Sequence, residues 1–220
     1  MSPVVHGLIA WLVAILILKD VNDRRLTVIA GVVPDIDGIF VLFNSELFLE
    51  YHHTLGHSFV YGVLIAIVAA GLAKDKKKAG AAAFLAFSLH LFSDYIGSDW
   101  AIHPIYPVSN ISFTIGSYLP NFVIYTIINP LVFIMILSII ILVIYKKEVS
   151  PLEFISEKLD NRFVNFYILP LKYKCYVCQK RAWYKCSLCG KMVCSKHGKG
   201  VIKPKCQGCS NIKKTERFNG

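Results

Sequence analysis

The sequence predicts an all-α polytopic membrane domain of about five spans, followed by a small cysteine-rich domain. The 220 residues are 55% hydrophobic with a mean hydropathy of +0.53, which is too apolar for an ordinary soluble domain. Residues 1–145 hold 7 Lys/Arg against 9 Asp/Glu, whereas residues 146–220 hold 17 against 5 and contain all seven cysteines. The chain therefore consists of two unlike parts.

A membrane-spanning helix needs about 20 mostly apolar residues. A further apolar stretch, Leu26–Leu49, is divided by Pro34–Gly38, because proline disfavours helix at the residue before it and glycine loosens the backbone after it. Broken backbone at membrane depth is tolerated only where protein or a wet cavity satisfies its polar groups, so we expect this segment to line a site. The other four expected spans are Pro3–Leu18, Leu55–Ala73, Ala79–Gly97 and Asn121–Tyr145, the last kinked at Pro130.

Basic residues predict the direction of the spans. Arg24 and Arg25, the lysines of 74–78, and Lys146 with Lys147 all fall on one side of the membrane if the chain crosses five times. The N-terminus of this cell-membrane protein is then outside and the cysteine-rich domain is in the cytoplasm. Nearly all candidate metal ligands then lie toward the non-cytoplasmic ends of their spans.

Histidine and aspartate residues recur inside the apolar stretches. A charged side chain near the middle of a spanning helix costs about 2.5–3.5 kcal/mol on insertion scales, and such residues are functional by default. His90 and Asp94 are four residues apart and share one helix face. Imidazole nitrogen and carboxylate oxygen suit zinc, which we favour, or another divalent first-row metal. A catalytic metal of this kind activates a water molecule.

Four motifs in order carry a family resemblance: His6-Gly7, Pro34-Asp35-Ile36-Asp37, His53-Thr54-Leu55-Gly56-His57-Ser58 and His90-Leu91-Phe92-Ser93-Asp94. Over about residues 1–110 the chain resembles the membrane-bound metal-dependent hydrolase family. These inner-membrane hydrolases of bacteria and archaea are distantly related to zinc-dependent phospholipase C and the single-strand-specific zinc nucleases. The resemblance implies one or two metal ions, with Asp94 placed to bridge two, and the ligands His6, Asp35, His57, His90 and Asp94.

The sequence departs from the soluble relatives in two respects. They use their N-terminal amine as a ligand and carry a second histidine/acid pair, and neither is visible here. Asp99 and His103 are candidates for part of that pair, and His53 is a further candidate ligand or an interfacial residue. Asp37 either caps the following helix or acts as general base, so Asp37 and Asp99 are the candidate catalytic residues.

The second part of the chain carries a zinc-ligand pattern. It reads Cys175-x2-Cys178-x7-Cys186-x2-Cys189-x4-Cys194-x2-His197-x8-Cys206-x2-Cys209, which supplies eight ligands for two structural, tetrahedral zinc ions. A cytoplasmic location favours zinc over disulfides. One interleaved pairing groups Cys175, Cys178, Cys194 and His197, and separately Cys186, Cys189, Cys206 and Cys209.

The finger resembles cross-brace treble-clef fingers of the FYVE and AN1 kinds, most closely over Cys186–Cys194. We therefore divide the chain into a membrane domain at 1–147, an amphipathic linker at 148–171, a zinc finger at 172–212 and a basic tail at 213–220. Apolar residues of the linker recur at steps of three or four, as in a helix that lies on the membrane or packs on the finger. The lysines of the finger suit nucleic acid, anionic lipid headgroups or a protein partner.

Three functions are compatible with these residues. The first is a metal-dependent hydrolase that cleaves a phosphodiester or ester bond of a lipid or lipid-linked substrate at the non-cytoplasmic face. The second is a metal-ion or proton transporter with its site at the broken segment, although no internal repeat is visible. The third is a membrane-anchored zinc-finger adaptor. We favour the hydrolase, because a mere anchor needs no set of buried His and Asp residues.

Overall fold

The computed structural model describes residues 1–42, 46, 52–54, 56–200 and 205–210, with the side chains of 37 and 39–42 left out. It divides into one unit at Met1–Ile140 and a second at Ile141–Gly220. The expected separation into a mostly helical N-terminal part and a small cysteine-rich part is confirmed.

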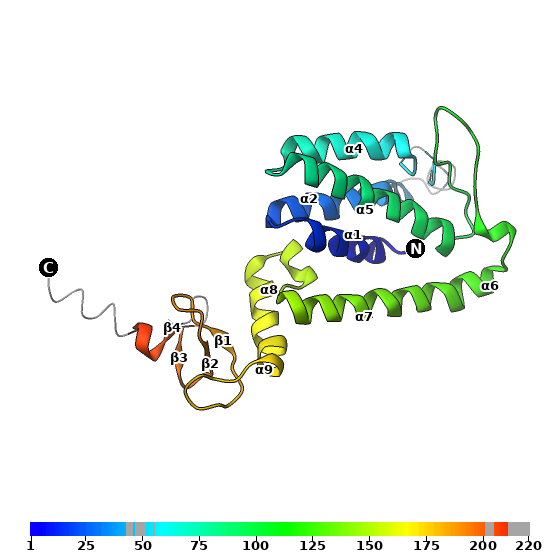
Figure 1. The fold of residues 1–220 in the computed structure, drawn as a ribbon. Coiled ribbons are helices and arrows are strands. Elements are labelled where there is room, and N and C mark those ends of the chain that lie inside the picture. The colour runs from blue at the N-terminus through cyan, green and yellow to red at the C-terminus, as the bar shows by residue number, and fades with distance from the viewer. Residues whose placement is uncertain (43–45, 47–51, 55, 201–204, 211–220) are drawn as a thin grey trace. The chain divides into compact units, whose positions relative to one another are not determined.

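Four helices form the centre of the first unit and lie side by side (Figure 1). They are α1 (Pro3–Ile17), α2 (Val21–Val32), α4 (Phe59–Leu72) and α5 (Lys76–Gly97). Helix α1 packs on α2 and α5, and α4 packs on α5. Short turns make α1 antiparallel to α2 and α4 antiparallel to α5. The starts of α1 and α4 and the ends of α2 and α5 therefore share one end of the bundle.

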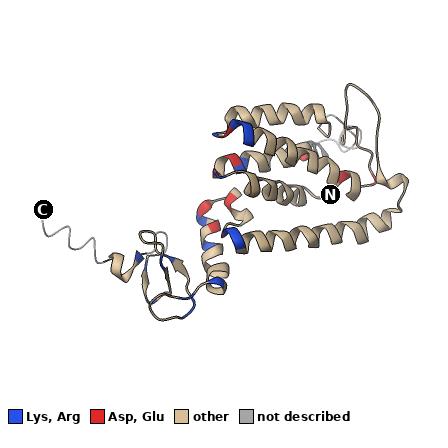
Figure 2. Cartoon of the chain, viewed as in Figure 1, with Lys and Arg blue, Asp and Glu red and all other residues tan. Residues whose placement is uncertain are grey.

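The opposite end of the bundle is held together by Asp23. Its buried carboxylate accepts hydrogen bonds from the backbone N–H groups of Lys74 and Asp75, at 2.9 and 3.0 Å. Asp20 caps α2 and also pairs with the Lys74 ammonium at 2.5 Å. These contacts join the α1–α2 turn to the α4–α5 turn. Lys and Arg residues gather at this end (Figure 2).

The interruption expected at Pro34 is present. Helix α2 ends at Val32, and a 3-10 helix, η1 (Val33–Leu42), continues the chain. The helix before the break begins at Val21 rather than at the expected Leu26, because the side chain of Asp20 accepts the N–H groups of Asn22 and Asp23 and so provides a cap.

A loop leads from α5 to the last helix of the unit and includes the 3-10 turn η2 (Ile115–Ser117). A continuous helical segment comes next, composed of α6 (Asn121–Val123), the π-helical turn η3 (Ile124–Ile128) and α7 (Asn129–Lys147). The π turn comes just before Pro130, where a kink was expected. Proline cannot donate to the preceding turn and its ring clashes there, and a wider turn relieves both problems.

Within the part of the chain that the structure describes, two helical segments are long and apolar enough to cross a membrane, namely Lys76–Gly97 and Asn121–Lys147. Helices α1 and α4 are apolar but shorter, with 15 and 14 residues. The count of five spans and the orientation of the chain stay predictions.

Helix α2 packs tightly against α1 at Gly31. A Cβ atom at this position would lie 2.4 Å from the Cβ of Ala10, so we expect Gly31→Ala to separate the helices and to destabilise the unit by about 1–3 kcal/mol, the usual cost of overpacking. Thermal unfolding in detergent measures the effect. Gly71→Ala is the matched control, because nothing lies within 4 Å of its added Cβ; equal melting temperatures for the two variants would contradict the prediction.

The second unit begins with the end of α7 and continues in short helical pieces. These are η4 (Pro151–Phe154), α8 (Glu157–Phe163), the π turn η5 (Val164–Ile168) and α9 (Leu169–Lys172). Ser150 and Ser156 cap η4 and α8 with their side chains, which divides the stretch that the apolar period alone would make one helix.

The cysteine-rich part contains two antiparallel β-hairpins. Strand β1 (Tyr184–Lys185) pairs with β2 (Met192–Val193), with Tyr184 opposite Val193. Strand β3 (Gly198–Lys199) pairs with β4 (Lys205–Cys206), with Gly198 opposite Cys206. Buried Cys186, Val193, Cys206 and Cys209 form a small core between them.

Candidate metal centre

Four of the predicted ligands lie together at the end of the bundle opposite Asp23. One ligand atom from each of His6, Asp35, His90 and Asp94 lies within 4.8 Å of every other. His6 comes from the first turns of α1, Asp35 from η1 just after α2, and the other two from the last turns of α5. The Nε2 atom of His6 lies 3.1 Å from Asp94 Oδ1, and that of His90 lies 3.0 Å from Asp94 Oδ2.

The fifth predicted ligand, His57, belongs to the same cluster. It lies just before Ser58, whose hydroxyl caps α4. Its Nε2 atom lies 3.5 Å from Asp35 Oδ1, 3.5 Å from Asp94 Oδ2 and 3.1 Å from His90 Nε2. The structure thus brings together all five predicted ligands, which we call the His/Asp cluster: His6, Asp35, His57, His90 and Asp94. Asp35 is nearly buried and the other four are fully buried.

Hydrogen bonds orient two of the three imidazoles of the cluster, those of His90 and His6. His90 Nδ1 lies 2.8 Å from the carbonyl oxygen of Gly31 and donates to it. Ser93 Oγ donates to the His90 carbonyl at 2.9 Å, so its lone pair accepts from His6 Nδ1 at 3.0 Å. Both rings therefore carry their proton on Nδ1 and direct the Nε2 lone pair into the cluster. Metal-binding histidines are held in this way by contacts to their second nitrogen.

The cluster has the chemistry of a cation site. Within the described residues, His6 Nε2, Asp35 Oδ2 and Asp94 Oδ2 are buried without a hydrogen-bond partner. Buried polar atoms left unpaired are costly, and here lone pairs and carboxylate oxygens face one another. A divalent cation would satisfy them all, and the mixed N/O set suits zinc or a similar metal. The residues therefore fit a metal ion.

Ser93 tests this arrangement without removing a ligand. Ser93→Ala removes the acceptor that fixes the proton of His6, so we expect the affinity of the His/Asp cluster for metal to fall by about 10–100-fold. Competition with a zinc chelator measures the change in the full chain. Ser88→Ala is the control, since the Ser88 hydroxyl on the same helix donates to the Phe84 carbonyl; equal affinities in the two variants would refute the role of Ser93.

The remaining site predictions have different outcomes. His53 is buried, but its Nε2 atom is 3.9 Å from Asp94 Oδ2, at the edge of the cluster, and it groups with His52 and His57 instead. The backbone N–H of His103 donates to the His53 carbonyl at 3.1 Å, which places this loop residue beside the cluster. The side chain of Asp37 lies outside the described residues, so its role as base stays a prediction.

Asp99 does not join the cluster. Its carboxylate accepts hydrogen bonds from Asn121 Nδ2 at 2.7 Å and from the Tyr125 hydroxyl at 2.5 Å, and its carbonyl accepts from Thr114. These contacts tie the loop to the start of the last helical segment. Both carboxylate oxygens thus hold the loop, and the catalytic role suggested for Asp99 stays a prediction.

Some contacts of the His/Asp cluster were not indicated by the sequence. The amino group of Met1 lies 2.5 Å from Asp94 Oδ1, whereas nothing in the sequence pointed to the N-terminal amine that the soluble relatives use as a ligand. The hydrogen bond from His90 to the Gly31 carbonyl was also not predicted, because the residue type does not show what a backbone carbonyl accepts. Ser93 could have been found, since it lies between His90 and Asp94 on the same helical turn.

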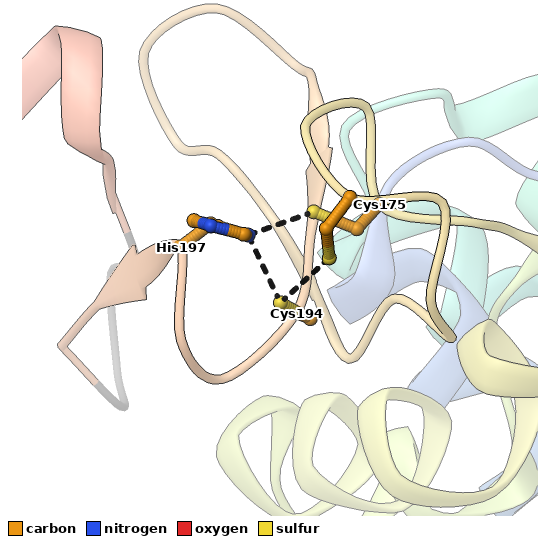
Figure 3. A group of neighbouring side chains, drawn as sticks. Cys175, Cys194 and His197 are labelled. Carbon is orange, nitrogen blue, oxygen red and sulfur yellow. Dashed lines mark hydrogen bonds between the residues drawn. The ribbon is translucent and has the colours of Figure 1, made fainter.

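The cysteines of the second unit form two compact groups. Cys175, Cys178, Cys194 and His197 form one, and Cys186, Cys189, Cys206 and Cys209 form the other, as in the interleaved pairing. In the first group, His197 Nδ1 lies 3.5 Å from Cys175 Sγ and 3.3 Å from Cys194 Sγ (Figure 3). The sulfur atoms of Cys178 and Cys194 are 3.7 Å apart. A tetrahedral zinc ion with 2.3 Å bonds sets its sulfurs about 3.8 Å apart, so both groups are consistent with zinc sites.

The thiols of these groups differ in how readily they ionise. Burial opposes the thiolate of Cys175, but N–H groups of Cys178 and Cys194 outweigh it and lower the pKa of this thiol to about 6. In the second group, hydrogen bonds with Cys206 and Cys189 raise the pKa of Cys209 to about 12. Four adjacent thiols cannot all ionise without a cation, and zinc supplies that charge.

A comparison with known protein families identifies the family of this chain. Residues 1–159 match the family described as YdjM inner membrane protein. The chain belongs to this family. The match covers the whole His/Asp cluster and agrees with the two helical segments that are long enough to cross a membrane. The prediction of a membrane protein is confirmed, whereas the hydrolase activity implied by the resemblance stays a prediction. No curated protein and no solved structure was found to match the chain.

Proposed function

We propose that this member of the YdjM family is a metal-dependent hydrolase of the membrane. Its substrate is a phosphodiester or ester of a lipid or lipid-linked molecule, and the site faces the non-cytoplasmic side. The observation that carries the proposal is the convergence of five metal-ligating side chains from separate parts of the bundle, with unpaired buried atoms directed at one point. A structural core has no use for such a set.

The chain contributes positioning and proton transfer. His6, His57 and His90 present ring nitrogens, and Asp35 and Asp94 present carboxylates, from elements that the packed bundle holds in place. A divalent cation bound there would polarise the scissile ester and acidify a water molecule. Asp37, two residues after Asp35 on η1, is the proposed acceptor of that proton.

The location of the cluster suggests its substrate. It lies at the end of the bundle away from the lysine and arginine residues (Figure 2), and the positive-inside rule assigns those residues to the cytoplasm. A groove of about 250 Å³ is lined by residues that include Phe59, Leu91 and Tyr95. Each of the three follows a cluster residue by one or two positions in the sequence. Apolar surface beside a metal-ligating cluster suits a substrate that stays in the bilayer.

Hydrolysis by purified full-length protein tests the proposal. Phospholipids and a chromogenic phosphodiester are offered with zinc or manganese, and Asp35→Asn is expected to lower the rate by about a hundredfold or more, since it removes a ligand charge. Asp75→Asn is the matched control, because Asp75 caps α5 at the opposite end of the bundle and asparagine caps equally well. Activity that survives in Asp35→Asn would exclude this site, and metal flux into sealed vesicles without hydrolysis would favour transport.

A further inference from the structure

The segment after α7 leaves the membrane helix and returns to it. Glu148 has a left-handed backbone with φ of 59°, which turns the chain away from the helix axis. Its Oε1 atom accepts hydrogen bonds from the Lys172 ammonium at 2.7 Å and from the Tyr173 hydroxyl at 2.5 Å. The same ammonium lies 5.7 Å from the centre of the Tyr145 ring. Residues 149–171 therefore form a closed loop whose two ends meet at the end of α7.

This closure keeps the start of the finger beside the end of α7. The helical segment Asn121–Lys147 has 27 residues and a length of about 40 Å, which matches a bilayer of about 40–45 Å with its headgroups. Glu148 then lies at headgroup level, and so does Tyr173, two residues before the first zinc-ligating cysteine of the finger.

A groove opens between the closed loop and the finger, within the second unit. It has a volume of about 520 Å³, and its lining includes Leu159, Phe163 and Phe166 from the loop and Trp183 from the finger. The rings of Phe166 and Trp183 are 5.6 Å apart. Phe166 is 60% exposed, which is a large apolar area to leave in water beside a bilayer.

The polar residues of the groove indicate what would enter it. The exposed guanidinium of Arg162 and the amide of Asn165 also line it, and both donate hydrogen bonds that suit a phosphate group. Residues 146–220 hold 17 Lys/Arg against 5 Asp/Glu, so the whole unit attracts anionic membrane surface. Aromatic rings with a basic rim match an acyl chain and a charged headgroup.

We propose that this groove binds an anionic phospholipid of the bilayer that holds α7. The phosphate lies against Arg162 and Asn165, and the upper part of an acyl chain lies over Phe163, Phe166 and Trp183. The bound lipid fixes the finger on the membrane surface and leaves its far side open to the cytoplasm. The proposal does not depend on hydrolysis at the His/Asp cluster.

Native mass spectrometry of the full-length protein in mild detergent tests lipid binding. Phosphatidylglycerol and phosphatidylcholine with identical acyl chains are added in separate arms, and glycerol phosphate in a third. We expect phosphatidylglycerol to be retained and Arg162→Glu to weaken its binding by about fivefold or more. Arg181→Glu is the matched control, with the same charge change at an exposed finger position outside the groove. The zinc content of each variant shows that the finger is folded.

Hydrogen exchange in nanodiscs locates the bound lipid. With phosphatidylglycerol present, amides of 157–172 are expected to exchange more slowly than in phosphatidylcholine alone, and Phe166→Ser should remove the difference. Equal losses of lipid in the Arg162 and Arg181 variants would overturn the groove in favour of diffuse charge attraction. Binding of glycerol phosphate as tight as that of the lipid, or protection by added nucleic acid but not by lipid, would also overturn it.

Discussion

The double change His90→Ala/Asp94→Ala should leave the full-length protein with two zinc ions per chain, both in the finger. The unchanged protein should hold one or two more. His90 and Asp94 are four residues apart on α5, and the Nε2 atom of one lies 3.0 Å from Oδ2 of the other. The double change removes two proposed ligands. The metal affinity should therefore fall by more than the roughly 10–100-fold that is lost when only a hydrogen-bond partner of a ligand is removed. Elemental analysis after detergent purification and dialysis measures the count.

A control with the same spacing exists on the opposite face of α5. Ser88 and Phe92 are also four residues apart, and Phe92 is 58% exposed, so Ser88→Ala/Phe92→Ala should keep the full metal count. Circular dichroism checks that both double variants retain their helices. If the His90/Asp94 variant held as much metal as the control, the His/Asp cluster would not be a metal site.

The second large effect is expected in the finger. Cys186→Ser should release both zinc ions and unfold both hairpins, because the two ligand groups interleave along the chain, structural zinc contributes about 10–16 kcal/mol to the folding of such domains, and the buried core of this one consists mainly of zinc ligands. Exchange of the amides of 173–210 should rise to that of an unfolded chain, while the amides of α1 and α5 stay protected.

Ser187→Ala provides the neighbouring control for that variant. Ser187 is exposed and lies between the ligands Cys186 and Cys189, so its change should leave two zinc ions bound and exchange unaltered. A finger that keeps its protection after Cys186→Ser, or after chelation, would show that the hairpins fold without metal.

The sequence indicated which residues would meet in the His/Asp cluster better than it indicated the contacts that hold them there. His6, Asp35, His57, His90 and Asp94 are conspicuous because polar groups inside apolar stretches are expensive, and helical spacing alone pairs His90 with Asp94. The break before Asp35 was predicted from Pro34, since proline acts locally. Each of these inferences depends on residue type and on neighbours within one or two turns.

The features that the sequence did not predict depend on tertiary contacts. The bond from His90 to the Gly31 carbonyl joins two helices, and no pattern of side chains records it. The hydrogen bonds of Asp99 with Asn121 and Tyr125 likewise join separate segments, and no local pattern indicated them. The loop at 149–171 has a helical period, yet serine caps divide it into short pieces, and its closure by Glu148 joins residues 24 and 25 positions apart.

The distribution of the ligands along the chain sets the order in which the protein can mature. His6 is made first, and Asp94 comes only near the end of the last of the four packed helices. A partly synthesised chain that ends after α2 and η1 holds one imidazole, His6, and one aspartate, Asp35, of the set, too few to capture a cation firmly. Binding of metal by the His/Asp cluster therefore waits until α4 and α5 are complete. The nascent polypeptide is thus spared from acquiring the wrong ion during insertion.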